Sequence, residues 1–443
     1  MNFEAALQVA NEAFFAHTQR YLSDVEVTLL RGAWENQTYQ EMSENTDYTA
    51  NYLQRTVGPK LWKQLSEALG ESVSKTNFRE ALKREMFHRN PAAISTVPPS
   101  PVSVEFPDKP VALDSQFYIE RPPIELDCYQ AIVQPGALIR IKAPQQMGKT
   151  SLLYRILTYA TTQGYRTVRL NLREAEGAVF SSLDKFLRWF CANVTLQLEL
   201  PNQLDNYWNE EVIGSMVSCK TYFQSYLLKR IDTPLVLALD EVDQVFQYPD
   251  IAKYFFPMLR SWHEEANNRA IWQQMRLIVV HSTEVYIPLN INQSPFNVGL
   301  PVDLKEFTPH QVADLATCHQ LDLHPEEVEQ IMLTIGGHPY LLRLAFYHLT
   351  RQDISLSTLL QDAPTDGGIY SDYLRRHLVT LKRHPQLAAA LKQVVTATKP
   401  VRLDTIQAYQ LHSMGLIQRQ GDLVIPSCEL YRHYFRDRLG EAG

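Results

Sequence analysis

The sequence predicts an α/β protein built around a parallel β-sheet with helices on both faces. Two continuous apolar runs, at residues 235–239 and 277–280, support this prediction, and residues 137–142 form a further plausible buried strand. Each run is short and bounded by segments of helical pattern, which is typical of strands that are buried on both faces. Residues 167–172 form one more expected strand, and the pattern from residue 308 onward is helical with short loops.

The composition is that of a globular protein. The chain has 443 residues, 45% of them hydrophobic and 21% charged, and a net charge of −7. This length allows two to four domains of roughly 100–200 residues, and the negative balance excludes a protein that binds nucleic acid through its overall charge. The five cysteines form no C-x-x-C pair, so neither a structural zinc site nor a disulfide framework is indicated. Without a signal-peptide pattern or an apolar run of the ~20 residues that span a bilayer, we expect a cytoplasmic protein.

Residues 143–150 read A-x-x-x-x-G-K-T, one residue short of the phosphate-binding loop G-x-x-x-x-G-K-[ST]. The segment lies between an expected strand and an expected helix, where backbone N–H groups and the helix dipole favour an anion. Gly148 would let the backbone approach the phosphates, Lys149 would reach the β and γ oxygens, and the Thr150 hydroxyl would ligate Mg²⁺. The alternative is a chance G-K-T. We therefore predict a P-loop NTPase whose nucleotide-binding residues include Pro144, Gln145, Gln146, Met147, Gly148, Lys149, Thr150 and Ser151.

A second motif follows about 90 residues later, where residues 235–243 read L-V-L-A-L-D-E-V-D. An apolar strand that ends in two acids is the Walker B pattern. Asp240 would belong to the Mg²⁺ shell together with Thr150, and Glu241 would polarise the attacking water. The alternative is that both acids simply cap a helix. An acid at this position also predicts an extra strand between the loop strand and the Walker B strand, with residues 167–172 as an outer strand.

The strand at residues 277–280 is followed by His281, Ser282 and Thr283. A polar side chain at the end of this strand can contact the γ-phosphate or the attacking water, so Ser282 and Thr283 are candidate catalytic residues. An ordinary strand end remains an equal alternative.

Together these residues resemble the STAND subgroup of AAA+-like signal-transduction ATPases, and within it a bacterial "AAA-like domain" family. Residues 117–125 look like an F-x-G-R-x-x-E segment, and the resemblance implies that Arg121 lies against the nucleotide base. Gly337-His338-Pro339 resembles the G-x-P motif of the lid helices, whose proline, here Pro339, approaches the nucleotide. Segments 292–299 and 429–436 look typical of the bacterial family. The resemblance covers essentially all of the chain and implies ATP or ADP with Mg²⁺.

The sequence departs from this family pattern in two places. Ala143 replaces the first glycine of the loop, where a small side chain is tolerated, so we expect binding to survive. The arginine that often follows the sensor strand in STAND proteins is absent, and Glu284 stands near its position. We therefore expect slow hydrolysis of ATP. Arg260 could act as an intersubunit finger in a nucleotide-dependent homo-oligomer, but a surface arginine is the favoured interpretation.

The N-terminal end resembles a helix-turn-helix of the vWA-MoxR-associated type. A capping box at residues 23–26 opens its first helix. If the module reads DNA, the exposed candidates are Asn51, Gln54, Arg55, Lys60 and Lys63. Residues 1–90 hold ten Lys and Arg against twelve Asp and Glu, a balance of −2, whereas DNA-binding modules usually have a basic footprint. A protein partner is therefore favoured, and DNA is the alternative.

We predict five regions along the chain. They are a helix-turn-helix module at 1–90, a Pro-rich linker at 91–112, a P-loop nucleotide-binding domain at 113–305, a helical lid at 306–383 and a winged helix at 384–443. The resemblance implies an ATP-binding regulatory switch of STAND type, in which ADP favours a closed state. The alternatives are a DNA-binding ATPase resembling origin-recognition or transposition ATPases and a non-hydrolysing, nucleotide-bound scaffold.

Overall fold

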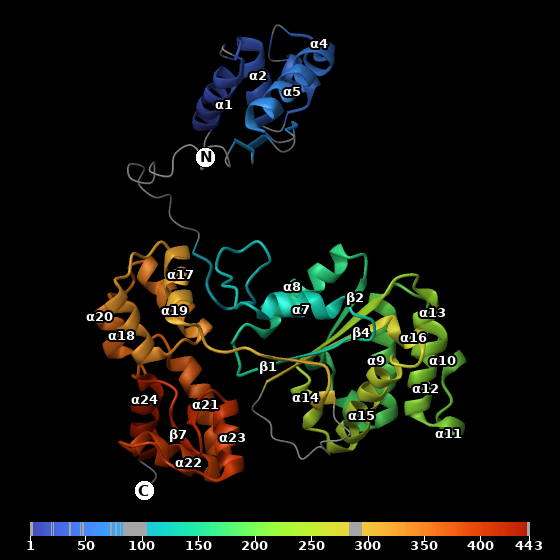
Figure 1. The fold of residues 1–443 in the computed structure, drawn as a ribbon, viewed down its shortest axis with the longest axis vertical. Helices are drawn as coiled ribbons and strands as arrows, with labels where there is room; N and C mark the ends of the chain where they lie inside the picture. The colour runs from blue at the N-terminus through green and yellow to red at the C-terminus, as the bar shows by residue number, and fades with distance from the viewer. Residues whose placement is uncertain are drawn as a thin grey trace. The chain divides into compact units, whose positions relative to one another are not determined.

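The computed structural model describes residues 3–18, 20, 22–34, 37–44, 46, 48–70, 73–75, 78–79, 81–82, 104–282 and 295–440. The chain divides into two compact units, Met1–Val102 and Ser103–Gly443 (Figure 1). Most of the expected Pro-rich linker, residues 91–103, lies outside the described residues. Within the described residues, no helix is both long and apolar enough to cross a membrane.

The first unit is helical in all its described elements, as predicted. Its elements are α1 (Phe3–Thr18), α2 (Asp24–Trp34), α3 (Tyr39–Glu44), α4 (Ala50–Tyr52), a π-helical turn (Leu53–Val57) and α5 (Gly58–Leu69). The expected cap of α2 is formed by Ser23, whose N–H and hydroxyl both donate to Glu26. The helix from Ala50 to Leu69 runs through Pro59 because the π-helical turn lets the Gly58 N–H reach the Leu53 carbonyl. A proline in a helix lacks an N–H and crowds the preceding turn, which such a wider turn relieves.

The second unit contains a five-stranded parallel sheet with strand order β2-β3-β4-β1-β5. The strands are β1 (Leu138–Ala143), β2 (Arg166–Asn171), β3 (Leu235–Asp240), β4 (Met275–Ser282) and β5 (Leu300–Asp303). The extra strand predicted between the loop strand β1 and the Walker B strand β3 is β4, and β2 is the outer strand. Both parts of that prediction are confirmed.

Helices cover both faces of this sheet, which explains why the strands read as continuous apolar runs. Val236 and Ala238 of β3 belong to one core cluster, with α7 (Ile124–Ile132) and α8 (Lys149–Thr162). Leu235, Leu237 and Leu239 belong to the opposite cluster, with α9 (Leu183–Gln197), α12 (Ser215–Tyr222) and α15 (Pro249–Glu265). Alternate side chains of one strand therefore face two different layers of helices (Figure 1). The shorter helical segments on this side are α10 (Leu204–Tyr207), α11 (Glu210–Ile213), α13 (Leu228–Arg230), α14 (Asp243–Phe246) and α16 (Ala270–Gln273).

The remainder of the second unit is mostly helical and shares one core. The lid helices are α17 (Pro309–Cys318), α18 (Pro325–Ile335), α19 (Pro339–Thr350), α20 (Leu356–Asp362) and α21 (Ser371–Arg383). They are followed by α22 (Pro385–Thr396), α23 (Thr405–Ser413), the antiparallel pair β6 (Ile417–Gln420) and β7 (Leu423–Pro426), and α24 (Glu429–Gly440). This is the predicted order of a winged helix. One apolar cluster runs from Phe307 to Phe435, so the lid and the winged helix pack as one body.

Candidate functional site

The predicted phosphate loop lies between β1 and α8, at the carboxyl edge of the sheet. Strand β1 ends at Ala143, and α8 begins at Lys149 with Gly148 as its N-cap residue. Gly148 has φ +94° and Gln146 has φ +59°, so the loop turns through two left-handed residues. Glycine adopts such a conformation without a steric penalty, which gives a physical reason for Gly148 beside Lys149. The strand–loop–helix context of the motif is confirmed.

The Lys149 side chain folds back on the loop and contacts its backbone carbonyls. Its Nζ donates to the carbonyls of Ala143 and Pro144, at 3.0 and 2.8 Å. Two other segments engage further loop carbonyls. Arg121 Nη2 donates to the Met147 carbonyl at 2.9 Å, and the His338 ring lies 3.2 Å from the Gln145 carbonyl through Nε2.

These contacts have one electrostatic consequence. When the carbonyls of a short loop are bonded to protein donors, their negative ends are neutralised and the loop N–H groups are left for an anion. The N-terminus of α8 adds its positive dipole end at the same place. The loop is therefore organised to accept phosphate oxygens.

Arg121 supports the loop through a hydrogen bond to its backbone. Its guanidinium is buried, stacks on the Phe307 ring at 4.6 Å and is not among the residues that line the cavity described below. Burial lowers the pKa of Arg121. The contact with a nucleotide base that the resemblance implies for Arg121 stays a prediction.

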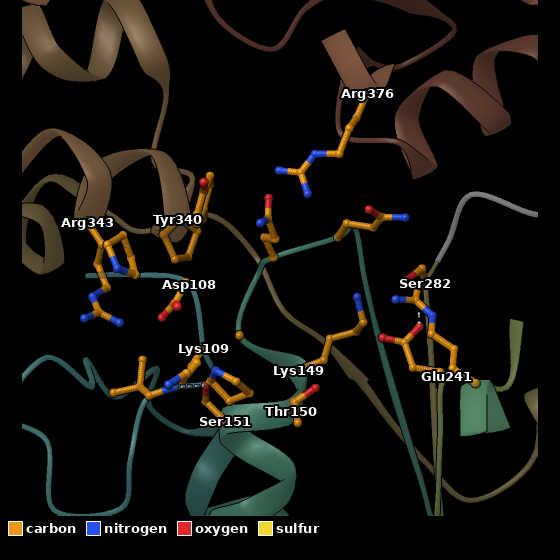
Figure 2. Close-up of a pocket in the computed structure, with 18 residues that line it drawn as sticks. Asp108, Lys109, Lys149, Thr150, Ser151, Glu241, Ser282, Tyr340, Arg343 and Arg376 are labelled. Carbon is orange, nitrogen blue, oxygen red and sulfur yellow. Dashed lines mark hydrogen bonds and ion pairs between the residues drawn. The ribbon is translucent and has the colours of Figure 1, made fainter. Parts of the chain in front are cut away.

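A cavity of about 310 Å³ opens in front of the loop (Figure 2). Most of the predicted residues lie on its wall. Those that do are Gln145, Gln146, Gly148, Lys149, Thr150, Ser151, Glu241, Ser282 and Pro339. Pro144, Met147, Arg121 and Asp240 do not line it, and Thr283 lies outside the described residues.

Sequence reasoning missed several residues of this wall. They are Pro107, Asp108, Lys109, Pro110, Val111, Arg173, Tyr340, Arg343 and Arg376. Residues 107–111 were expected to belong to the linker, but they pack on α8, where the Val111 N–H donates to the Ser151 hydroxyl at 2.9 Å. A proline-rich composition predicts an extended backbone but not what that backbone contacts.

Each of the two Walker B acids is paired with an arginine from the end of β2. Asp240 is buried, and its Oδ2 accepts from Arg169 Nη2 at 2.7 Å. Glu241 faces the cavity with φ +56°, and its Oε2 lies 3.0 Å from Arg173 Nη2. The parallel register, which pairs Asn171 with Asp240, places these side chains together.

The end of β4 supplies one more polar group to the wall. The Ser282 N–H donates to Asp243 Oδ2 at 2.7 Å, which fixes the strand end next to the acids. Its side chain is buried but reaches the cavity. Ser282 therefore lies on the cavity wall, and its sensor role stays a prediction, while Thr283 and Glu284 lie outside the described residues.

The Gly337-His338-Pro339 segment joins the lid to the loop. A Cβ on Gly337 would overlap the Phe307 carbonyl oxygen, so only glycine fits there. Pro339 begins α19 and reaches the cavity wall, where its missing N–H costs nothing. His338 is buried, and burial lowers its pKa to about 3, so its ring is neutral.

A chain of buried side chains continues from His338 to the last helix. The Tyr373 hydroxyl of α21 lies 3.4 Å from His338 Nε2 and 3.0 Å from the Tyr431 hydroxyl of α24. The winged helix also contacts the loop strand directly, because the Lys142 ammonium lies 5.2 Å from the ring centre of Tyr409. The loop, the lid and the C-terminal helix are thus in physical contact.

The cavity suits a nucleoside phosphate, and the acids suit its metal ion in part. Thr150 offers a hydroxyl on the cavity wall. Asp240 Oδ2 is occupied by Arg169, while Oδ1 accepts only the Glu241 N–H, at 3.1 Å. Since a carboxylate has about four acceptor positions, Oδ1 retains one for Mg²⁺ or for a water of its shell. Among the described residues, no cluster of three or more His, Cys, Asp or Glu side chains forms a separate metal site.

The five candidate nucleic-acid residues of the first unit are all exposed. Asn51 lies on α4, Gln54 and Arg55 lie on the π-helical turn, and Lys60 and Lys63 lie on α5. Together with Tyr52, which is 45% exposed, they follow one continuous helix. Lys63 Nζ lies 3.9 Å from the Glu67 carboxylate. The structure thus confirms that these residues are accessible.

Two family models match the chain. A model described as an AAA-like domain matches residues 106–437, and one described as the N-terminal HTH of vWA-MoxR associated proteins matches residues 1–85. Among curated proteins, none matches the sequence.

Solved structures resemble the fold at low sequence identity. A Walker-type ATPase of Pyrococcus abyssi aligns with a TM-score of 0.51 at 13% identity, covering 72% of this chain and 96% of that one. The ORC2 protein of Aeropyrum pernix aligns at 0.43 and 15% identity, covering 74% and 98%. A STAND protein with a tetratricopeptide repeat sensor from Pyrococcus horikoshii aligns at 0.30 and 14%, covering 76% and 44%. At these identities the first likeness shows a P-loop ATPase fold and nothing finer.

Proposed function

Since the chain belongs to the family of AAA-like domains, we propose that it is an ATP-binding regulatory switch of STAND type. One observation supports this function above the others. The phosphate loop is bonded by a lid residue, His338, that is itself bonded through Tyr373 to the C-terminal helix α24. The loop is therefore one hydrogen bond from the lid and three from α24.

The residues of the loop would bind the phosphates. Lys149 and the loop N–H groups would meet the β and γ oxygens, and Ser151 follows two residues later on the same wall. Thr150 and Asp240 would hold Mg²⁺, which neutralises charge on the phosphates when bound. Residues 107–111 and Pro339 also line the cavity, where the rest of the nucleotide would lie.

Hydrolysis would depend on Glu241. Its carboxylate lies on the cavity wall, where it can orient a water molecule, but it is paired with Arg173. A paired carboxylate is a weaker acceptor for a water proton than a free one, so we propose slow turnover. A non-hydrolysing scaffold is the alternative, and steady ATP turnover that Glu241→Gln abolishes would exclude it.

The switch follows from differential binding. A ligand shifts an equilibrium between two arrangements only if it binds them with different affinity. Between ATP and ADP, the γ-phosphate is the group that differs. It would lie near Lys149 and Glu241, so we propose that ADP favours the closed arrangement of lid and loop and that ATP loosens it.

The test of nucleotide binding is an equilibrium titration of the full chain with a fluorescent ATP analogue. We expect Lys149→Ala to weaken binding by about 100-fold, because the ammonium makes charge-assisted bonds to two phosphates. Lys399→Ala is the control, since Lys399 is exposed and lies off the cavity wall. Equal affinity of parent and Lys149→Ala would refute the function.

A DNA-binding ATPase is the second candidate, favoured by the exposed residues along α4 and α5. The balance of −2 in residues 1–90 favours a protein partner instead. A gel shift on random duplex DNA at two salt concentrations separates these candidates, since binding through phosphates weakens steeply with salt. Absence of salt-dependent binding would remove the DNA function.

A further inference from the structure

The sequence lacks the arginine that was expected after the sensor strand, but the structure brings another arginine to the cavity. Arg173 lies in the 3-10 turn Leu172–Glu174 that follows β2, and it shares the cavity wall with Lys149 and Glu241. Neither the motifs nor the family resemblance assigns it a role. Arg173 is therefore a positively charged side chain at the phosphate end of the site, and its role has not yet been explained.

The position of Arg173 is fixed by its backbone. The Asn171 side chain caps the 3-10 turn and accepts the Arg173 N–H at 3.1 Å. The register of β2 with β3 pairs Asn171 with Asp240, so the turn that carries Arg173 lies beside Glu241. The guanidinium then reaches Glu241 Oε2 at 3.0 Å. In Figure 2 the side chains of Lys149 and Glu241 point into the same part of the cavity.

Arg173 differs from its neighbour Arg169 in exposure. The Arg169 side chain is 26% exposed, lies over the Tyr154 ring and pairs with an acid that is only 2% exposed. Such a pair is enclosed and serves to compensate a buried charge. The Arg173 side chain is 58% exposed and its partner Glu241 is 22% exposed, both at the cavity. An exposed ion pair of this kind is weak, so Arg173 can change partner at small cost.

We propose that Arg173 is the residue by which this chain distinguishes a nucleoside triphosphate from a diphosphate, exchanging Glu241 for the terminal phosphate. The inference rests on the proposed nucleotide binding. A guanidinium forms paired hydrogen bonds with phosphate, which carries more charge than a carboxylate. The exchange also releases Glu241 to accept a proton from water. Arg173 thereby links recognition of the triphosphate to the ability of Glu241 to accept a proton from water.

The test compares the affinity of the full chain for Mg²⁺ with a non-hydrolysable β,γ-imido ATP analogue and for Mg²⁺ with ADP. We expect Arg173→Ala to lower the affinity for the triphosphate analogue by about tenfold, which is the low end for the loss of a charge-assisted hydrogen bond. The affinity for ADP should change by less than about twofold. Arg173→Lys should recover part of the loss, because it keeps the charge and loses the paired geometry. Arg269→Ala is the matched control, since Arg269 forms an exposed pair with Glu265 at 3.1 Å away from the cavity.

A second comparison tests the exchange of partners. Glu241→Gln removes the carboxylate that competes with the terminal phosphate for Arg173. It should therefore increase the affinity for the triphosphate analogue more in the parent chain than in the Arg173→Ala variant. A double-mutant cycle isolates this coupling from simple loss of charge repulsion, which acts in both backgrounds.

The outcomes distinguish a failure of the role proposed for Arg173 from a failure of the proposed nucleotide binding. Equal loss for both nucleotides, no loss for either, or no coupling in the cycle would overturn the role of Arg173 while nucleotide binding stands. If the parent binds neither nucleotide, or Lys149→Ala binds both as tightly as the parent, the proposed function itself fails.

Discussion

Single buried residues of the second unit hold the phosphate loop in place, and Arg121 is the clearest case. Arg121→Met removes the donor to the Met147 carbonyl and leaves that carbonyl without its partner, which costs about 1–3 kcal/mol. We expect the chain to lose stability and to bind the ATP analogue about tenfold less tightly, since the loop itself is disturbed.

Arg276→Met is the matched control for this prediction. Arg276 is also buried and donates to two backbone carbonyls, those of Gln273 and Val133. It lies at the start of β4, at the edge of the sheet opposite the loop. Thermal unfolding should show a similar loss for both variants, while titration should show weaker binding only for Arg121→Met. Equal affinities would show that Arg121 serves the fold alone.

Gly337 gives a residue-scale prediction about the fold of the lid. In Gly337→Ala the new methyl group would overlap the Phe307 carbonyl, and the backbone must move. Such overpacking costs about 1–3 kcal/mol, to be measured as a fall in the free energy of unfolding in urea. Gly177→Ala, where no atom lies within 4 Å of the added carbon, should stay within about 0.5 kcal/mol of the parent. Similar losses in the two variants would contradict the packing argument.

At the scale of elements, the lid helices carry three buried histidines. Burial lowers the pKa of His319 and His338 to about 3 and that of His377 to about 4. Above a pH of about 6.5 the rings are neutral in both the folded and the unfolded chain. Below this pH the unfolded chain binds protons that the folded chain does not. The free energy of unfolding therefore decreases as the pH is lowered, until the pKa values of the folded chain are reached.

This difference predicts an acid-sensitive lid. Between pH 6.5 and 4 the three rings together lower the free energy of unfolding by up to about 4 kcal/mol per pH unit. Urea unfolding at several pH values measures the slope. His319→Phe, which keeps a ring against Phe117, should reduce the slope by about 1.4 kcal/mol per pH unit. An unchanged slope in this variant would show that His319 is protonated in the folded chain.

The sequence predicted the elements of the sheet better than it predicted their side-chain partners. The strands β3 and β4 were visible because burial on both faces demands runs of apolar residues, and Gly148 and Lys149 stand at fixed spacing within eight residues. The position of β4 between β1 and β3 followed from the acid at residue 240.

The partners of the charged groups could not be predicted in the same way. Arg121 meets Met147 across 26 residues, and His338 meets Gln145 across 193. No periodic pattern reports such contacts, because they depend on how elements pack and not on local backbone preference. Arg169 and Arg173 left a weak signal, two arginines four residues apart at a strand end, but their acids became visible only once β2 was paired with β3.

On the scale of the whole second unit, the lid and the winged helix form one body that touches the phosphate loop. They share one apolar core, and a Cβ on Gly415, between α23 and β6, would lie 3.2 Å from Pro144 of the loop. Together with the His338–Tyr373–Tyr431 contacts, this places α24 in reach of any change at the loop. We propose that the nucleotide in the loop controls how this body is held.

Hydrogen exchange of the amides in α21 and α24 tests this claim most directly, measured on the full chain saturated with Mg²⁺ and either the β,γ-imido ATP analogue or ADP. We expect faster exchange in these helices with the triphosphate analogue than with ADP, and no such difference in Lys149→Ala. Identical exchange in α21 and α24 with both nucleotides bound to the parent would contradict it.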